Sequence, residues 1–406
     1  SPYLCYGKEL PNSTGRAMSA FWQNTIRQAI DFRRELHSEP ELSWQETRTA
    51  QKIRTALSDM NIEWTPCAGT GTLARLNIGA SSLSRPHIAL RGDIDALPIH
   101  EQTGKTWASR QMGCMHACGH DGHTAVLVAA ARYLKSVEYA LPGPVTLIFQ
   151  PAEEGGHGAL RMIEDGALEG IDEIYGWHNW PAIPYGKMVC PDGIVMCGNG
   201  TFEITVTGQG GHASQPELCR DPVLAGSAMV QALQQVVARR LAPQQAAVLS
   251  VTSFDAPSRF TVIPQQAVLG GSIRVPDNAT RDAINALIVE VVEHTARAHG
   301  VSAEVAIQPR YNATVNHAKQ ASYLRETWCK QNGSDALDTK IPVPIMASED
   351  FSYYLQEIPG AFALIGAGVP EQRAHPCHSP FSAWLSSTLS ESSSANTLFA
   401  IGRRVR

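Results

Sequence analysis

The chain has 406 residues, of which 43% are hydrophobic and 17% are charged, with a formal net charge of −5. This length exceeds one ordinary hydrophobic core, so we expect two domains, and the composition is that of a globular protein rather than a disordered or fibrous one. The negative charge and the lack of a lysine- or arginine-rich run argue against a nucleic-acid partner. No apolar stretch reaches the roughly 18–20 residues that span a membrane.

Two features bear on the compartment. Residues 1–24 lack the charged start and the apolar block of a secretory signal, so we expect none in this segment. The nine cysteines form an odd-numbered set without a regular framework. In a chain of this size, that pattern predicts reduced thiols and a cytoplasmic location.

Outside the middle of the chain, short apolar runs alternate with amphipathic segments. A helix or helix pair interrupted by Pro40 is expected over residues 20–60. The further elements we expect are strands at 87–91, 145–149, 173–177 and 361–365 and helices at 122–137 and 159–164. This alternation predicts the α/β class, with a mostly parallel sheet that has helices on both faces.

Polar side chains follow each of these four predicted strands. In chain order they are Asp93 and Asp95, then Glu153 and Glu154, then His178, and finally His375 and His378. In open α/β sheets, ligands bind outside the carboxyl ends of the strands. We therefore expect these acids and imidazoles to meet at one edge of the sheet.

The middle of the chain has a different pattern. Its elements have the order β-α-β-β-α-β, with strands at 202–207, 247–254, 267–275 and 302–307 and helices at 222–240 and 279–299. That order is typical of a ferredoxin-like unit. We therefore expect a discontinuous catalytic metal-binding domain of residues 1–194 and 310–406, and an inserted α+β lid or dimerisation domain of residues 195–309.

Residues 113–123 hold the densest group of metal-ligand side chains. Cys118 and His120 lie in a glycine-rich turn that enters a helix, where the helix dipole favours a thiolate. Taken alone, they could equally be a buried inert cysteine beside a surface histidine. A structural zinc knuckle of Cys114 and Cys118 is disfavoured, because no second paired-cysteine motif at finger spacing exists.

The adjacent carboxylates of Glu153 and Glu154 are costly unless a positive charge lies between them. In the functional interpretation, Glu154 binds a metal ion and Glu153 takes a proton from an activated water. The alternative is two ordinary solvated glutamates at a helix start. For His178 and His378, the alternatives to ligands are a satisfied core histidine and a turn histidine.

Five motifs occur in an order typical of one family: residues 91–98, the Cys118 and His120 block, and residues 150–156, 210–214 and 347–351. The chain resembles the metallo-amidohydrolases related to aminoacylase and glutamate carboxypeptidase. Within them it is similar to the branch with hippurate hydrolases and indole-acetyl-amino-acid hydrolases. The resemblance spans about residues 25–380.

The resemblance implies a centre of two divalent metal ions per subunit, with zinc, manganese, nickel or cobalt as candidates. It implies five metal ligands, which are Cys118, His120, Glu154, His178 and His378. Cys118 takes the place of a bridging aspartate found in the carboxypeptidase branch. Glu153 would be the general base, and Asp95 would support the ligands. A thiolate with three imidazoles suits zinc, nickel, cobalt or iron better than magnesium or calcium.

The resemblance also implies a homodimer formed through the inserted domain. His212 would then stabilise the oxyanion in the partner's active site, and Arg274 would pair with the substrate's α-carboxylate; a strand-surface arginine is the alternative for Arg274. The substrate-binding candidate Thr261 stands where the family usually has asparagine. Residues 381–406 are serine-rich and differ from the family's usual acidic ending.

The reaction we expect is hydrolysis of the amide bond of a small-molecule N-acyl amino acid, in particular an N-acetyl one. Residues 215–217, 261–264 and 311–317 resemble deacetylases of N-acetyl-2,4-diaminobutyrate from ectoine breakdown. A metallo-carboxypeptidase or dipeptidase is the alternative among enzymes. A metal-dependent binding protein with a relict site is the non-enzymatic alternative, against which the intact Glu153 and Glu154 argue.

Overall fold

The computed structural model describes residues 12–79, 85–368 and 377–379, which fall into two compact units. Unit 1 takes its described residues from 1–190, 317–341 and 357–406, and unit 2 consists of 191–316 and 342–356. These units are defined by contacts between residues and not by function. The boundaries of a catalytic and a lid or dimerisation domain at 194/195 and 309/310 therefore stay a prediction. Among the described residues, none of the helices combines the length and the apolar character needed to cross a lipid bilayer.

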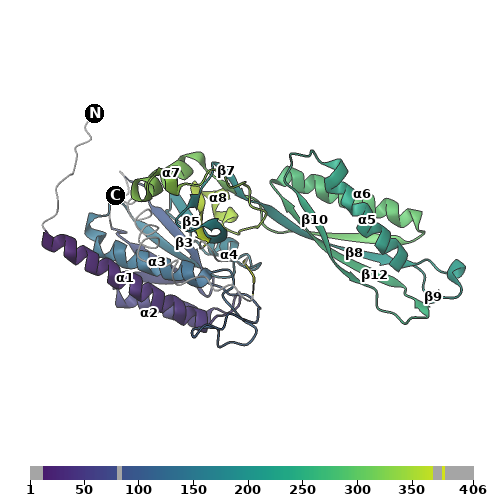
Figure 1. Ribbon diagram of the computed structural model, residues 1–406, viewed down its shortest axis with the longest axis horizontal. Helices are drawn as coiled ribbons and strands as arrows, with labels where there is room; N and C mark the ends of the chain where they lie inside the picture. The colour runs from purple at the N-terminus through teal and green to yellow at the C-terminus, as the bar shows by residue number, and fades with distance from the viewer. Residues whose placement is uncertain (1–11, 80–84, 369–376, 380–406) are drawn as a thin grey trace. The chain divides into compact units, whose positions relative to one another are not determined.

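Unit 1 is built on a seven-stranded sheet with the order β1-β2-β4-β3-β5-β15-β6 (Figure 1). Its strands are β1 (Glu63–Cys67), β2 (Gly71–Leu76), β3 (Ile88–Asp93), β4 (Val145–Gln150), β5 (Glu173–Pro184), β6 (Met188–Val189) and β15 (Gly360–Gly368). The central strands β4, β3, β5 and β15 are parallel, whereas β1, β2 and β6 pair antiparallel at the edges. The prediction of a mostly parallel sheet is confirmed.

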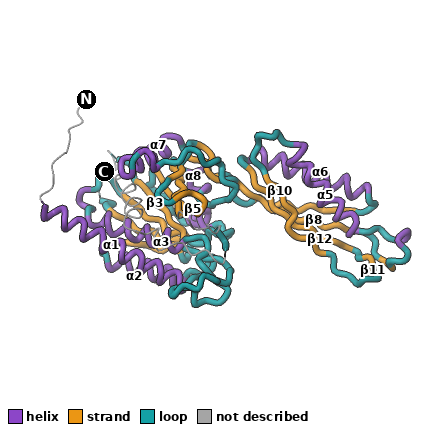
Figure 2. The backbone as a smooth tube through the Cα atoms, viewed as in Figure 1, coloured by secondary structure: helices purple, strands orange, loops and turns teal. Residues whose placement is uncertain are grey.

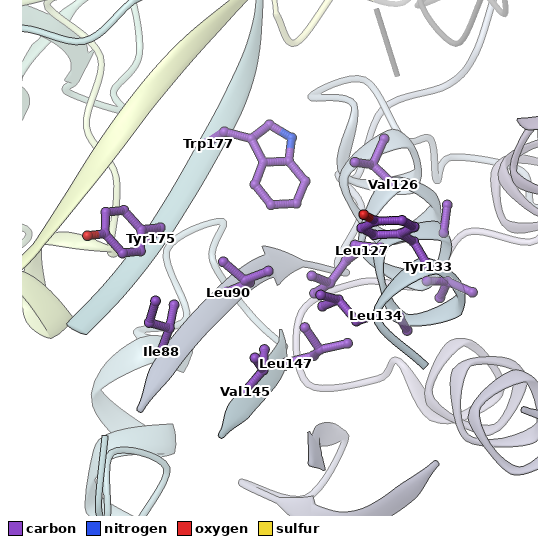
Figure 3. Close-up of a cluster of buried hydrophobic side chains, with 14 of the residues drawn as sticks. Ile88, Leu90, Val126, Leu127, Tyr133, Leu134, Val145, Leu147, Tyr175 and Trp177 are labelled. Carbon is purple, nitrogen blue, oxygen red and sulfur yellow. The ribbon is translucent and has the colours of Figure 1, made fainter. Parts of the chain in front are cut away.

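The core of unit 1 explains why these segments form strands. Every residue of β3 and β4 is buried, so both faces of the sheet are covered, as the continuous apolar runs predict. On one face, Ile88, Leu90 and Leu147 pack beside Leu127 and Leu134 of a helix (Figure 3). Burying each such side chain stabilises the fold by about 1.5–3 kcal/mol.

The first four helices of unit 1 follow the predicted order, whereas the last one was not predicted from the sequence. They are α1 (Asn12–Ser38), α2 (Thr47–Asp59), α3 (His120–Ser136), α4 (Gly158–Glu164) and α7 (Ala318–Asn332). Helix α1 ends just before Pro40, because a residue preceding proline disfavours the α conformation. Helix α3 is buried over nearly its whole length, in keeping with its alanine- and valine-rich sequence.

Unit 2 contains an antiparallel sheet with the order β10-β12-β8-β13 and two long helices (Figure 2), and most of the short helix α8 (Ser352–Glu357) also belongs to it. Its elements are β8 (Gly198–Thr207), α5 (Pro222–Arg240), β10 (Val248–Asp255), β12 (Gln266–Val275), α6 (Asn278–Ala298) and β13 (Ser302–Pro309). Side chains of β12 alternate between buried and half-buried, so one face supplies the core. The side chains of Asp221 and Asp277 cap the two helices. The predicted ferredoxin-like order is therefore observed.

One strand differs from the prediction. Strand β5 was expected at 173–177 with His178 after it, but it runs from Glu173 to Pro184 and contains His178. It continues because β15 pairs with it in parallel, with Leu364 opposite His178. His375 and the serine-rich residues 381–406 lie outside the described residues.

Candidate metal centre

A tight turn after β4 presents Glu153 and Glu154. Its backbone has positive φ at Ala152 (52°) and His157 (56°). A Cβ atom on Gly158 would lie 1.7 Å from the Pro151 carbonyl oxygen, so only glycine fits this close approach. The carboxylate of Glu46 accepts the Ala152 N–H at 2.9 Å. The turn is therefore stabilised by its own close backbone packing and by Glu46, the residue directly before α2.

A second turn presents Cys118 and His120. Gly119, between them, has a φ of 86°, a conformation that residues with side chains rarely adopt. Helix α3 begins directly afterwards at His120. The prediction that this turn enters a helix is confirmed.

The structure brings the five predicted ligands together with Glu153 in unit 1. Three donor groups each have their ligand atoms within 4.8 Å of one another, and they share members: Cys118, His120 and His178; Cys118, Glu154 and His378; His120, Glu153 and Glu154. The Cys118 Sγ lies 3.5 Å from Nε2 of His178, and Glu154 Oε1 lies 3.5 Å from Nε2 of His378. The shared members make one continuous cluster.

Hydrogen bonds orient two of the imidazoles. Nδ1 of His120 lies 3.1 Å from Oδ1 of Asp95, and Nδ1 of His178 lies 2.6 Å from the Asn179 carbonyl oxygen. Because each Nδ1–H donates to an oxygen, each Nε2 keeps its lone pair for a metal ion. Asp95 also accepts the Ser43 hydroxyl at 2.7 Å and the Glu154 N–H at 3.0 Å. The predicted supporting acid thus contacts one predicted ligand through its ring and another through its backbone.

Two polar atoms in the cluster are buried without a hydrogen-bond partner, namely Nε2 of His120 and Oε1 of Glu154. Leaving such an atom unpaired costs about 1–3 kcal/mol. The two atoms lie 3.8 Å apart, too far for a good hydrogen bond and close enough to share a cation. The residues present therefore fit a divalent metal ion.

The electrostatics of the cluster also favour a cation. Burial lowers the pKa of His120, but the carboxylates of Asp93 and Asp95 outweigh it and hold that pKa well above its usual value. The Glu154 carboxylate, whose Oε1 lies 3.5 Å from Nε2 of His378, raises the pKa of His378. In the absence of metal, protons therefore occupy imidazoles that a metal ion would bind, and protons and metal compete.

His123 is a neighbouring imidazole with a different role. Its Nδ1 lies 2.6 Å from Oδ1 of Asp93, and its Nε2 accepts the Asn179 N–H at 3.0 Å. Both ring nitrogens are thus occupied, and burial lowers the pKa of His123. It also meets Asp93 and His120 in a possible donor group. We interpret His123 as a positioning residue rather than a ligand.

A buried network that the sequence did not reveal connects α1 to the first turn of α3. Nδ1 of His37 lies 2.9 Å from Asp121, and Arg33 Nε lies 3.1 Å from the same carboxylate. Nε2 of His37 lies 3.2 Å from Oε1 of Glu101, and Oε2 of Glu101 accepts the Ser109 N–H. Burial lowers the pKa of His37, but Asp121 and Glu101 outweigh it and raise that pKa to about 9.

The remaining predicted site residues belong to unit 2. His212 lies on β9 (Gly211–His212), which pairs with β11 (Val262–Ile263), and the Ala213 N–H donates to the Thr261 carbonyl at 2.9 Å. Nδ1 of His212 accepts the Ser214 N–H at 3.1 Å, which leaves the proton on Nε2. His212 and Thr261 are therefore neighbours, and His212 presents a donor.

Arg274 lies on β12 and is half-buried. Its NH1 donates to the Ser348 hydroxyl at 2.8 Å. Burial lowers the pKa of Arg274, and the charge of Arg310 lowers it further. Two guanidinium groups near each other within unit 2 form a positive region that suits an anionic group.

Cys377 is a residue of the centre that the sequence did not single out. It packs against the cluster of Leu97, Met115, Ala117 and Cys118. The thiols of Cys118 and Cys377 are hydrogen-bonded, and this bond is the main reason why the pKa of Cys118 is raised. The only signal in the sequence is its position directly before the predicted ligand His378.

The fold and the donor set together define a metal-binding α/β protein with an inserted ferredoxin-like unit. Residues 89–390 match peptidase family M20/M25/M40, and the chain belongs to this family. It is 39% identical over 376 residues to the N-acetyl-L-cysteine deacetylase of Bacillus subtilis (strain 168), covering 92% of this chain and 89% of that protein.

Two further proteins are similar over most of their length. The hippurate hydrolase of Campylobacter jejuni is 35% identical over 336 residues, covering 82% of this chain and 86% of that protein. The crystal structure of the Bacillus subtilis YXEP protein, described as a dinuclear metal binding peptidase from the M20 family, superposes with a TM-score of 0.77 at 31% identity. That match covers 96% of this chain and 100% of the YXEP chain. The family resemblance expected from the motifs is confirmed.

Proposed function

We propose that this protein is a metal-dependent amidohydrolase that cleaves the amide bond of N-acyl amino acids at a centre of two divalent ions. The observation that carries the proposal is the pair of buried, unpartnered ligand atoms on His120 and Glu154 within a cluster that also holds Glu153. Membership of the M20/M25/M40 family and the similarity to a deacetylase and a hippurate hydrolase support the reaction class.

In this proposal Cys118, His120, Glu154, His178 and His378 hold the two ions. When bound, such ions polarise a carbonyl oxygen and lower the pKa of a water toward about 7. Glu153 accepts the proton of the attacking water and passes it to the leaving amine. Asp95 keeps the His120 ring in the tautomer that presents Nε2.

Residues of unit 2 complete the proposed mechanism. His212, with its proton on Nε2, would donate a hydrogen bond to the oxyanion, a contact worth about 3–4 kcal/mol in comparable sites. Arg274 would pair with the substrate's α-carboxylate, and Thr261 would contact the substrate at the place where the family resemblance implies an asparagine. Through the family resemblance we also propose a homodimer, in which His212 acts on the partner's substrate. The odd-numbered set of cysteines without a regular framework supports a cytoplasmic location.

The substrate proposal has a finer part. The motifs at 215–217, 261–264 and 311–317 support N-acetyl-2,4-diaminobutyrate as the substrate. Assays of that compound beside N-acetylcysteine, hippurate and a dipeptide would test it. Good activity on hippurate together with none on N-acetyl-diaminobutyrate would remove the finer proposal, and preference for the dipeptide would favour the peptidase alternative.

The general proposal is tested by replacing the base. Glu153→Gln removes the proton acceptor while keeping the size of the side chain, so we expect full metal content with nearly complete loss of turnover. Glu164→Gln, a change at an exposed glutamate on α4 that pairs with Arg161, is the matched control and should retain activity. Substantial turnover by Glu153→Gln would refute the assigned role. Wild-type protein that hydrolyses nothing with zinc, manganese, nickel or cobalt would favour the binding-protein alternative.

A further inference from the structure

Two cysteines meet in the metal centre although they lie far apart in the sequence. The thiols of Cys118 and Cys377 are hydrogen-bonded to each other. Their backbones are also adjacent, because the His378 N–H donates to the Ala117 carbonyl at 3.4 Å. Backbone proximity of this kind is a precondition for a disulfide, which needs neighbouring Cα atoms.

The two thiols differ in their relation to the metal ligands. Among the donor groups that the described residues form, two include Cys118 and none includes Cys377. Cys118 is 8% exposed, whereas Cys377 is only partly buried. Cys377 is therefore the more accessible sulfur and has no ligand role in this arrangement. Cys377 can therefore react first with an oxidant and then form a bond with the sulfur of Cys118.

We propose that Cys118 and Cys377 are a redox modification site, at which a hydroperoxide forms a reversible disulfide that removes the thiolate ligand and releases metal. This inference goes beyond the proposed hydrolase activity, and its metal-release part rests on the proposed role of Cys118 as a ligand. Transient disulfides of this type are known as sensors in otherwise reducing compartments.

The chemistry balances with hydrogen peroxide as the oxidant. The Cys377 sulfur attacks the peroxide, so an S–O bond forms, the O–O bond breaks and one water leaves after protonation. The Cys118 sulfur then attacks the sulfenic sulfur, so the S–S bond forms, the S–O bond breaks and a second water leaves. In total, the two thiols lose two protons and two electrons, and one peroxide takes them up and becomes two waters.

Other described cysteines are less suited to this reaction. Of the eight, all are free, and only Cys329 and Cys377 are not fully buried. Burial raises the pKa of Cys114, the nearest cysteine in sequence to Cys118, to about 11, which keeps it as an unreactive thiol. Cys329 lies on α7 and is partly buried, as Cys377 is, so it provides a matched control.

The test treats the metal-loaded protein with hydrogen peroxide and follows three readouts: released metal, free thiols and the crosslinked peptides. For the wild type and for Cys329→Ser, we expect a crosslink between the peptides of Cys118 and Cys377 to appear together with metal release. A thiol reductant should reverse both in the presence of added metal. In Cys377→Ser no crosslink can form, and the sulfenic acid of Cys118 has no resolving thiol. With excess peroxide, a second equivalent then oxidises it to sulfinic acid and leaves as water, so the metal loss should not be restored by a reductant.

Three outcomes would overturn the proposal. They are oxidation without the Cys118–Cys377 crosslink, a crosslink that forms while the metal stays bound, and reversible metal release by Cys377→Ser as in the wild type. Peptide mapping of the wild type decides the matter even if a variant folds poorly. The crosslink is measured independently of hydrolysis. A wild type that binds metal but hydrolyses nothing would therefore count against the proposed function and not against the redox site.

Discussion

The network around His37 predicts an unusual pH dependence of stability. The His37 ring is fully buried and faces Arg33 on its own helix, Asp121 on α3 and Glu101 in the loop before the Cys118 turn. Its other neighbours are the rings of Trp107 and His116. A protonated His37 and Arg33 together balance the two carboxylates. The substitution His37→Gln removes one of these two positive charges.

The magnitude follows from the pKa. His37 has a pKa of about 9 in the folded protein against 6.5 in the unfolded chain. At about 1.4 kcal/mol per pKa unit, protonated His37 contributes about 3 kcal/mol to the free energy of unfolding. Because the folded pKa is the higher one, this stability is fully present below pH 6.5 and is lost as the pH rises through about 9.

The assay is urea unfolding of the metal-free wild type and His37→Gln between about pH 6 and pH 10. The difference in unfolding free energy between the two proteins should shrink by about 3 kcal/mol over this interval. His294→Gln, a change at an exposed histidine of α6, is the matched control and should give no such trend. A difference that stays constant with pH, or the same decline in the control, would show that this network does not hold His37 protonated.

Three further predictions concern the site. Asp95→Ala removes the acceptor of His120 Nδ1–H, so metal affinity should fall roughly 10–100-fold in competition with a chelator; unchanged affinity would contradict the role of Asp95. His123→Gln should lower the melting temperature yet keep the metal stoichiometry, whereas His120→Gln should lose metal; equal losses in elemental analysis would make His123 a ligand. Gly158→Ala should destabilise the fold by about 1–3 kcal/mol in denaturant unfolding, because its Cβ would overlap Pro151; a neutral effect would show that the turn relaxes freely.

The sequence predicted the central sheet well because its strands are buried on both faces and therefore read as continuous apolar runs. The antiparallel strands β1 and β2 were missed, since their sequences mix polar and apolar residues and contain proline or glycine. The extension of β5 through His178 was also missed. It depends on pairing with β15, which is distant in the sequence and which no local pattern reports.

The ligand types could be predicted because Cys118, His120 and the paired glutamates lie in short motifs. What the motifs could not give is the arrangement between distant segments. His37 and Asp121 are 84 positions apart, and His37 and Glu101 are 64 apart, so the buried network appears only in the fold. Cys377 was one of nine cysteines, and no spacing between neighbouring residues in the sequence indicates its contact with Cys118.

We propose that two neighbouring divalent cations are held by Cys118, His120, Glu154, His178 and His378. Anomalous X-ray scattering from a metal-loaded crystal would locate these cations. We predict two peaks, with nitrogen, oxygen and sulfur ligand atoms of these five residues at about 2.0–2.3 Å. A single ion, or ions bonded through His123 while His178 or His378 remains unbound, would contradict the account.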